Sequence, residues 1–364
     1  MKNIPHIIIV ILFFGLLLLP QIFDRCMEFD RSIANENRNL TQLPKKFKYS
    51  KIASELEAYY NDRIPFRSIL LNGCSIIQNH LFSFTMGELL IGEKGFYFYR
   101  KPGWEDPVDQ FRGKEKLRKY DLLKAERFLT TLNKHLEKNN IDFLMVIAPN
   151  KVQVYPEYLP ERRRYTESLL MPDIQLCHFM QQRAPQIPIL HLRQYLLQAK
   201  KHYNENLYYK LDSHWGLVGG YIGAREIIRH FDHRAELPAA GDFTIVPSGK
   251  NEPGDLQNLA LRKTECPVHP EMKPDVPEFT GKIDGTGKGY LYSYNPDAPD
   301  KRRVLMYRDS FAFSLMPYIS LHFQEVYYVR SHDVSLQYIE KVKPDILILE
   351  YVARVIGRMK TKIR

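Results

Sequence analysis

The sequence predicts an α/β fold built on a doubly wound parallel sheet. Short apolar runs of strand length alternate with longer runs of helical period, and the end of the chain reads strand, helix, strand, helix, strand. Polar side chains follow several of these strands directly, at the edge where open α/β sheets bind their ligands. The chain has 364 residues, is 44% hydrophobic and contains no internal repeat, so it is large enough to bury one substantial core.

The chain begins with an apolar stretch, Ile4 to Phe23, that is long enough to span a membrane. The small residues that precede a signal-peptide cleavage site are absent from its end. We therefore expect residues 1–25 to form an uncleaved membrane anchor, and the polar residues 26–50 to form a tether. Basic residues lie on both sides of the span. Their balance alone slightly favours an orientation that would keep the following domain in the cytoplasm.

Residues 51–364 are expected to form one large domain, whose clearest helix runs from Lys114 to Asn139 with one apolar stripe. The period then changes to that of a short strand, Ile141 to Ile147, which ends in a polar turn. Two residues of this turn are candidates for the site. The Asn150 amide either donates to an oxyanion or caps the turn, and Lys151 either meets a substrate carboxylate or is solvated.

A second helix and strand follow over Thr166 to Arg183, with a break near Pro172, and over Ile187 to Leu192. His191 lies within this strand between two leucines, and we interpret it as a core or edge histidine.

The next motif is Asp212-Ser213-His214-Trp215, directly before a predicted helix from Gly216 to Phe231. Residues two apart in extended chain project to the same side, so Asp212 and His214 share a face, as a carboxylate that orients a histidine ring requires. Trp215 is a candidate for the wall of the site.

The pattern loosens between residues 236 and 301, where prolines and glycines are frequent. We expect an irregular insertion with short strands at Asp242 to Val246 and Gly289 to Tyr294, and insertions of this kind often form the rim of a site. The alternating tyrosines at 290, 292 and 294 form either a strand face or a platform for sugar rings.

A strand from Arg303 to Tyr307 then ends in a sharp polar turn that carries Ser310, with a helical run behind it. A serine at such a turn is a candidate nucleophile, but its hydroxyl needs a base that a third group orients. His214 and Asp212 are the candidates for those two roles. Tyr307 and Arg308, at the same turn, are candidates for substrate binding.

The formal net charge of +10 allows several kinds of anionic partner, among them nucleic acid, lipid and acidic polymer, although scattered solvated lysines give the same total. An exported chain would not meet nucleic acid. No nucleotide-binding loop is visible, and we expect no cofactor.

The four cysteines are widely spaced and lack a zinc pattern. Outside the cytoplasm they could pair as disulfides in three ways, or they could remain buried thiols. Asp212 and His214 have no third metal ligand near them in the sequence, so we expect no metal site.

Together these motifs resemble the AlgJ/AlgX family, SGNH-hydrolase-like proteins of alginate and other exopolysaccharide O-acetylation. The resemblance covers nearly the whole chain and rests on stretches in this order: Glu36-Asn37-Arg38, Asn61-Asp62-Arg63-Ile64-Pro65-Phe66-Arg67, Ile91-Gly92-Glu93-Lys94-Gly95-Phe96-Tyr97-Phe98-Tyr99, Pro149-Asn150-Lys151, Asp212-Ser213-His214-Trp215, Asp309-Ser310-Phe311 and Lys343-Pro344-Asp345.

The resemblance implies an SGNH-hydrolase-like, flavodoxin-like fold with a circularly permuted order of catalytic residues, since Asp212 and His214 precede Ser310. The serine turn departs from the Gly-Asp-Ser that the family resemblance leads us to expect, because Arg308 stands in place of the glycine. That side chain would either crowd the turn or supply a cation beside the site.

The resemblance also implies a protein of the inner membrane whose catalytic domain lies in the periplasm. It would be an O-acetyltransferase or acetylesterase acting on a polysaccharide through an acyl-enzyme on Ser310. A membrane-bound O-acyltransferase would supply the acetyl group, and Asn150 with the Ser310 backbone N–H would hold the oxyanion. The alternative is an inactive scaffold or glycan-binding subunit of an acetylation complex.

Overall fold

The computed structural model describes residues 13, 41–43, 52–61, 88–101, 103, 105–160, 166–203, 206–235, 245–247, 254–256, 270–272, 280–283, 289–359 and 361. The chain divides into two compact units. One comprises residues 1–86 with 257–264, and the other comprises residues 87–256 with 265–364. The central sheet and every residue of the site described below belong to the second unit.

The second unit is built on a seven-stranded sheet in the order β4-β3-β11-β9-β10-β8-β7. Five neighbours, β4 to β10 in this order, run parallel, and β8 and β7 are antiparallel additions at one edge. The strands are β3 (Asp142–Ala148), β4 (Ile189–His191), β7 (Thr280–Ile283), β8 (Gly289–Tyr294), β9 (Asp300–Tyr307), β10 (Phe323–Val329) and β11 (Ile346–Val352).

The sheet is therefore mixed, and the expectation of a wholly parallel sheet is corrected at this edge. Only residues 295–299 connect β8 to β9, which is too short for the crossover that a parallel strand needs. The region expected to be an irregular insertion supplies both antiparallel strands, and β8 has the bounds expected from the sequence.

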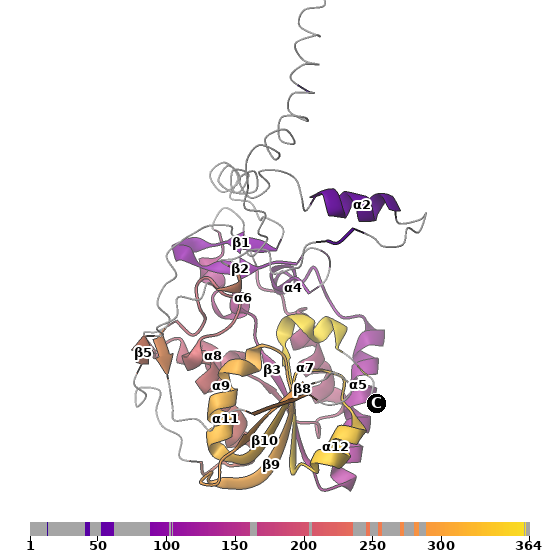
Figure 1. The fold of residues 1–364 in the computed structure, drawn as a ribbon, viewed down its shortest axis with the longest axis vertical. Coiled ribbons are helices and arrows are strands. Elements are labelled where there is room, and N and C mark those ends of the chain that lie inside the picture. The colour runs from indigo at the N-terminus through magenta and orange to yellow at the C-terminus, as the bar shows by residue number, and fades with distance from the viewer. Residues whose placement is uncertain are drawn as a thin grey trace, which may run out of the picture. The chain divides into compact units, whose positions relative to one another are not determined.

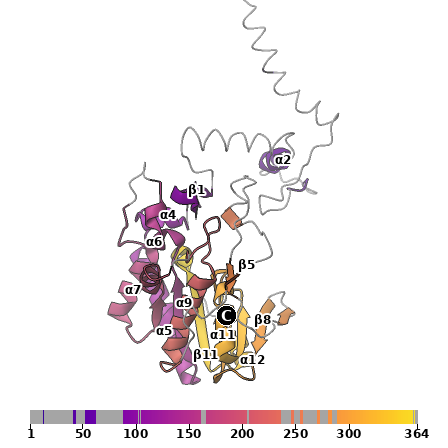
Figure 2. The ribbon, with the colours of Figure 1, turned by 90° about the vertical axis from the view of Figure 1, so that its left-hand side faces the viewer.

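Helices cover both faces of the sheet, with α8, α9 and α11 on one side and α5, α7 and α12 on the other (Figure 1). In the turned view, β8 lies on the far side of β11 from α7 (Figure 2). The helices are α5 (Lys119–Lys138), α7 (Pro172–Arg183), α8 (Arg193–Ala199), α9 (Leu217–Phe231), α11 (Met316–His322) and α12 (Leu336–Val342).

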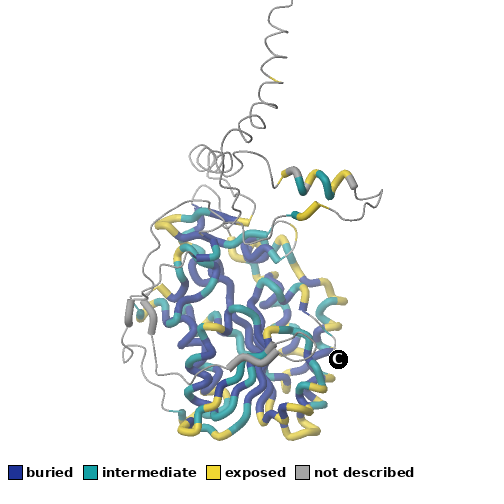
Figure 3. The backbone as a smooth tube through the Cα atoms, in the orientation of Figure 1, coloured by how far each residue is buried: buried dark blue, intermediate teal, exposed yellow. Residues whose placement is uncertain are grey.

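Alternate residues of each central strand enter two separate hydrophobic clusters, which is why both faces need helices. In β3, Leu144 and Val146 pack toward α9, whereas Met145 and Ile147 pack toward α5 and α7. The central strands β3 and β11 are buried along nearly their whole length (Figure 3). The predicted doubly wound arrangement is thus confirmed.

Capping residues and prolines explain where the helices differ from their predicted bounds. Helix α5 begins at Lys119 rather than Lys114, and the Asp121 carboxylate accepts the Arg118 backbone N–H at 3.2 Å at its start. Helix α7 begins at Pro172, where the sequence predicted a break. The predicted helix after Ser310 is divided into a 3₁₀ turn, η5 (Phe311–Ser314), and α11, which carries a proline in its first turn.

A small antiparallel hairpin is formed by β1 (Leu89–Ile91) and β2 (Tyr97–Tyr99). The remaining elements are α2 (Ile52–Asn61), η2 (Glu93–Gly95), α4 (Pro107–Phe111), α6 (Lys151–Val154), η3 (Pro156–Tyr158), β5 (Ile245–Pro247), β6 (Pro270–Met272) and η6 (Ala353–Arg358).

The predicted anchor, residues 1–25, and tether, residues 26–50, lie outside the described residues except for Phe13 and residues 41–43. Within the described part of the chain, no helix combines the length and the apolar character that crossing a membrane requires. Of the four cysteines, Cys177 is described and is a free thiol, whose pKa burial raises to about 12.

Candidate active site

The site lies where three neighbouring parallel strands end. The turn with Asn150 and Lys151 follows β3, Arg354 follows β11, and the turn with Ser310 follows β9. Because β11 lies between β3 and β9, the carboxyl ends of these strands bring the three turns to one edge of the sheet.

The loop before α9 brings Asp212 and His214 to this edge. An isolated antiparallel bridge between Tyr208 and Trp215 closes the loop, and the Gly216 N–H donates to the Leu207 carbonyl at 2.8 Å. Gly254 packs against it so closely that a Cβ there would lie 2.3 Å from the Leu211 carbonyl oxygen. Loop geometry therefore depends on contacts with a distant segment.

His214 lies between Ser310 and Asp212. Its Nε2 is 2.8 Å from Ser310 Oγ, and its Nδ1 is 2.7 Å from Asp212 Oδ1, which also accepts the His214 backbone N–H at 2.8 Å. Both Ser310 and His214 are partly exposed. A hydroxyl, an imidazole and a carboxylate in this order can move the hydroxyl proton to the ring while the carboxylate holds the ring in place.

A second carboxylate, Asp255, was missed by the sequence analysis. Its Oδ2 is 3.6 Å from His214 Nδ1, it accepts the backbone N–H and the hydroxyl of Ser213, and its own N–H donates to Asp212 Oδ2 at 3.0 Å. Asp255 comes from the region that was expected to form a rim. Its only sequence signal is a Gly-Asp pair in an otherwise irregular stretch.

The two carboxylates differ in how readily they ionise. Burial alone would raise the pKa of Asp212, but the hydrogen bond and charge of His214 outweigh burial and hold that pKa below its usual range. Burial, followed by the charge of Asp212, raises the pKa of Asp255. Asp212 is therefore the carboxylate that stays ionised beside the imidazole.

The Asp309 carboxylate stabilises the serine turn by accepting two backbone N–H groups. Asp309 Oδ1 accepts the Phe311 N–H and Oδ2 accepts the Val352 N–H of β11, both at 2.8 Å. The Asp309 side chain thus points into the turn. The Ser310 N–H donates to no described group. The backbone of Ser310 has an ordinary right-handed helical conformation, with φ of −73°.

Arg308 does not crowd this turn. It is absent from the described non-glycine residues with positive φ, so the conformation here does not require the glycine expected from the resemblance. The side chain is 3% exposed, donates to the Asp309 carbonyl and lies over the Phe313 ring at 4.2 Å. The guanidinium packs on residues of its own turn, so the structure does not support the predicted substrate-binding role of Arg308.

Two other candidates are buried and cannot reach a substrate. Trp215 is fully buried, and its Nε1 donates to the Phe311 carbonyl at 2.8 Å, which ties the start of α9 to the serine turn. Tyr307 is 1% exposed in the cluster on the α12 face, with its hydroxyl on the backbone of Ser335. Both residues support the site and do not line it.

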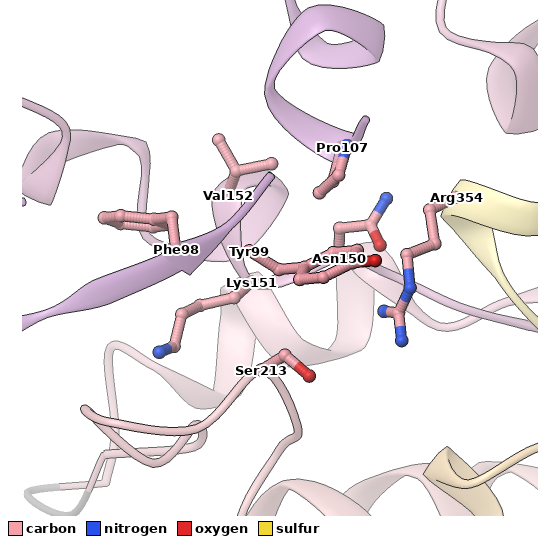
Figure 4. A pocket seen from close by; sticks show the side chains of 8 residues that line it. All are labelled: Phe98, Tyr99, Pro107, Asn150, Lys151, Val152, Ser213 and Arg354. Atoms are coloured by element: carbon pink, nitrogen blue, oxygen red, sulfur yellow. The ribbon is translucent and has the colours of Figure 1, made fainter. Parts of the chain in front are cut away.

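Asn150 borders a small hollow that Ser213 and Arg354 also line, and its Oδ1 is buried without a partner among the described residues. Figure 4 shows the residues that line the hollow, which are Phe98, Tyr99, Pro107, Asn150, Lys151, Val152, Ser213 and Arg354. Gln153 Oε1 accepts the Asn150 backbone N–H at 2.6 Å and holds Asn150 at the start of α6, and the role of the Asn150 amide stays a prediction.

Lys151 is neither solvated nor directed at a substrate, which corrects both alternatives from the sequence. It is 4% exposed, and its Nζ donates to three main-chain carbonyl groups. In Figure 4 its ammonium points away from the side on which Arg354 and the Ser213 hydroxyl lie.

Arg354 is a second residue that the sequence analysis missed. Its guanidinium lies over the Phe311 ring at 5.1 Å and the Tyr99 ring at 5.4 Å, and among the described residues it makes no ion pair. A half-buried cation therefore borders the hollow beside the nucleophile's turn.

Asp212, His214 and Asp255 place ligand atoms within 4.8 Å of one another, a set that could hold a metal ion. The sequence had suggested no third ligand near the first two, and Asp255 corrects this. These atoms are already joined to one another, to Ser213 and to Ser310 by hydrogen bonds, which a metal ion would have to displace.

Known proteins resemble this chain in sequence and in fold. A curated relative, named "Probable alginate O-acetylase AlgJ" of Pseudomonas aeruginosa, is 23% identical over 209 residues, which are 57% of this chain and 49% of the relative. This chain therefore spans about half the length of that protein.

Two solved structures share the fold. PatB1 of Bacillus cereus matches with a TM-score of 0.53 at 15% identity, over 75% of this chain and 99% of PatB1. A DHHW family protein of Eubacterium siraeum matches with a TM-score of 0.51 at 13% identity, over 76% of this chain and 94% of that one.

Residues 101–291 match the family described as "SGNH hydrolase-like domain, acetyltransferase AlgX". The match spans more than half of the chain and includes Asp212, His214 and Asp255, whereas Ser310 lies beyond it. The chain belongs to this AlgX family of SGNH hydrolase-like acetyltransferase domains.

Proposed function

We propose that this protein is an O-acetyltransferase or acetylesterase that acts on an exported polysaccharide through an acyl-enzyme on Ser310. The observation that carries the proposal is the position of His214, 2.8 Å from Ser310 Oγ and 2.7 Å from Asp212. Membership of the AlgX family and the name of the AlgJ relative support acetyl as the group and a polysaccharide as the acceptor.

The chemistry requires only these three side chains and the main chain. Ser310 Oγ bonds to the acetyl carbonyl carbon as its proton passes to His214 Nε2, and the bond to the donor oxygen breaks as His214 returns the proton to it. An acceptor hydroxyl then gives its proton to His214 and takes the acetyl group, and Ser310 recovers the proton. Water as acceptor gives acetate, so the same steps serve transfer and hydrolysis.

The Ser310 N–H is the main donor that we assign to the oxyanion. It has no acceptor among the described groups and belongs to the residue that carries the nucleophile. The Asn150 amide, at the border of the adjoining hollow, is the second candidate. Fixed donors of this kind stabilise the charge that develops on the carbonyl oxygen.

The partners and location follow the same proposal. Residues 1–25 would anchor the protein in the inner membrane, with the catalytic unit in the periplasm. By analogy with the AlgJ/AlgX family, a membrane-bound O-acyltransferase would supply the acetyl group. The alternative is an inactive scaffold or glycan-binding subunit.

Turnover of p-nitrophenyl acetate by the full-length protein in detergent separates these possibilities. We expect Ser310→Ala to lower kcat/KM by about 10³-fold or more, because the nucleophile is lost. The control variant Ser331→Ala, a change outside the site, should hydrolyse p-nitrophenyl acetate at the wild-type rate. A chelator should not change the rate of the wild type.

Activity that survives Ser310→Ala would contradict the serine mechanism. Activity that disappears on chelation would indicate a metal at Asp212, His214 and Asp255 instead. A scaffold would retain polysaccharide on an affinity column but release no p-nitrophenol above the Ser310→Ala background.

A further inference from the structure

Main-chain carbonyl groups surround the ammonium of Lys151. Its Nζ donates to the carbonyl oxygens of Tyr97 at 2.6 Å, Lys210 at 2.9 Å and Asp212 at 2.7 Å. Tyr97 belongs to β2, and Lys210 and Asp212 belong to the loop before α9. One side chain at the end of β3 thus joins a hairpin to the loop that carries Asp212 and His214.

These bonds require the charged form of Lys151. An ammonium has three N–H donors, whereas a neutral amine has two and a lone pair that would face one of the carbonyl oxygens. The side chain is only 4% exposed, so water cannot readily replace a lost bond. When the Lys151 ammonium loses its proton, one of its three hydrogen bonds to main-chain carbonyl groups is therefore lost.

The surroundings of the ammonium contain charges of both signs. The carboxylates of Asp212 and Asp255 attract it. The rings of Phe96 and Phe98 lie 5.5 and 5.7 Å from Nζ, and the Lys210 ammonium lies 5.8 Å from the same Phe96 ring as a like charge. None of these groups replaces a carbonyl acceptor, so the three main-chain bonds decide where Nζ lies.

We propose that Lys151 is a positioning residue of the site, whose ammonium fixes the Asp212 main chain and thereby orients the His214 ring toward Ser310. The inference deepens and rests on the proposed function, because it gives Lys151 a part in activating the same nucleophile. Lys151 touches no reacting atom and acts through Asp212.

The role predicts that Ser310 loses reactivity at alkaline pH. Burial lowers the pKa of Lys151 to about 7, against the attraction of Asp212 and Asp255. Below this value all three carbonyl bonds are present, and as the pH rises through it one bond is lost. A displacement of about 1 Å near reacting groups costs roughly 10²-fold in rate.

Labelling of Ser310 by methanesulfonyl fluoride measures this reactivity without a natural substrate. The Oγ–S bond forms, the S–F bond breaks with loss of fluoride, and the hydroxyl proton passes to His214. Intact mass of the full-length protein in detergent gives the labelling rate between about pH 5 and pH 10.

We expect Lys151→Met to label about 10²-fold more slowly than the wild type below pH ~7 and to lack its alkaline decline. Lys151→Arg keeps its charge at every pH tested, so it should retain more of the rate and show no decline within the tested range. Lys200→Met is the matched control, since Lys200 donates to the Val154 carbonyl at 2.6 Å and pairs with Glu157 outside the loop.

Labelling of Lys151→Met at the wild-type rate, or a wild-type rate that does not decline at alkaline pH, would overturn the proposal. If Lys151→Met fails to fold, the wild-type decline and its absence from Lys151→Arg decide. Ser310 could be labelled with the expected pH dependence while p-nitrophenyl acetate is not turned over. That result would contradict the proposed acetyl transfer and would support the role of Lys151.

Discussion

At the scale of single residues, His214 is the group on which the other side chains of the site converge. Its two ring nitrogens face Ser310 on one side and Asp212 with Asp255 on the other. An imidazolium formed during the reaction would therefore have two carboxyl groups beside it. Only Asp212 makes the short contact to Nδ1, at 2.7 Å against 3.6 Å for Asp255.

The two carboxyl groups should differ in their effect on activity. We expect Asp212→Asn to lower kcat for p-nitrophenyl acetate by about 10³- to 10⁴-fold, because an amide leaves the ring in the wrong tautomer. Asp255→Asn should lower kcat for p-nitrophenyl acetate by only about tenfold, because it removes a carboxyl group that lies farther from the imidazole.

Asp297→Asn is the control, because the Asp297 side chain is exposed and the residue's backbone N–H donates to Asn295 Oδ1 at 3.1 Å. An Asp255→Asn variant that is as inactive as Asp212→Asn would reverse the assignment of the orienting carboxylate.

At the scale of elements, strand β11 supports the turn that follows its neighbour β9. The Val352 N–H of β11 donates to Asp309, and the Asp309 N–H donates in turn to Glu350 Oε2 at 2.9 Å. Glu350 is fully buried, and its Oε1 has no partner among the described residues. Burial, followed by the charge of Asp309, raises the pKa of Glu350 well above its usual range.

A raised pKa for a buried carboxyl group makes stability fall as pH rises. The native state holds the Glu350 proton more tightly than the unfolded chain, so this contribution is complete below pH ~4.5 and is lost as pH rises through the folded pKa. Glu350→Gln keeps an acceptor for the Asp309 N–H and removes the titration.

We therefore expect Glu350→Gln to be more stable than the wild type at pH ~8 by about 1 kcal/mol, or roughly 2 °C in Tm, with little difference near pH 4.5. Thermal melts at several pH values measure this. A variant that is less stable than the wild type at pH ~8 would show that the carboxylate form supports the turn.

At the scale of the whole molecule, the sheet and the three central residues of the site could be predicted because their signals are local. The period changes at Ile141, and Asp212 and His214 stand two apart in extended chain. Ser310 follows a buried strand directly. Each pattern is contained within a few residues, so tertiary contacts are not needed to recognise it.

The parts that the sequence did not predict depend on contacts between distant segments. The carbonyl acceptors of Lys151 lie 54, 59 and 61 residues away from it, so its burial cannot be read from a strand-end turn. Asp255 reaches the site only because Gly254 packs against Leu211. Arg354 belongs to the site because β11 ends beside the serine turn.

Trapping of the acyl-enzyme is the most direct test of the central claim, that Ser310 carries the acetyl group and His214 activates it. The full-length protein is mixed with p-nitrophenyl acetate, quenched in acid, digested and analysed by mass spectrometry. The account predicts one acetyl group on the peptide that contains Ser310, and its loss in Ser310→Ala and His214→Ala. Rapid turnover with acetyl found on another residue, or with an unmodified Ser310 at every quench time, would contradict it.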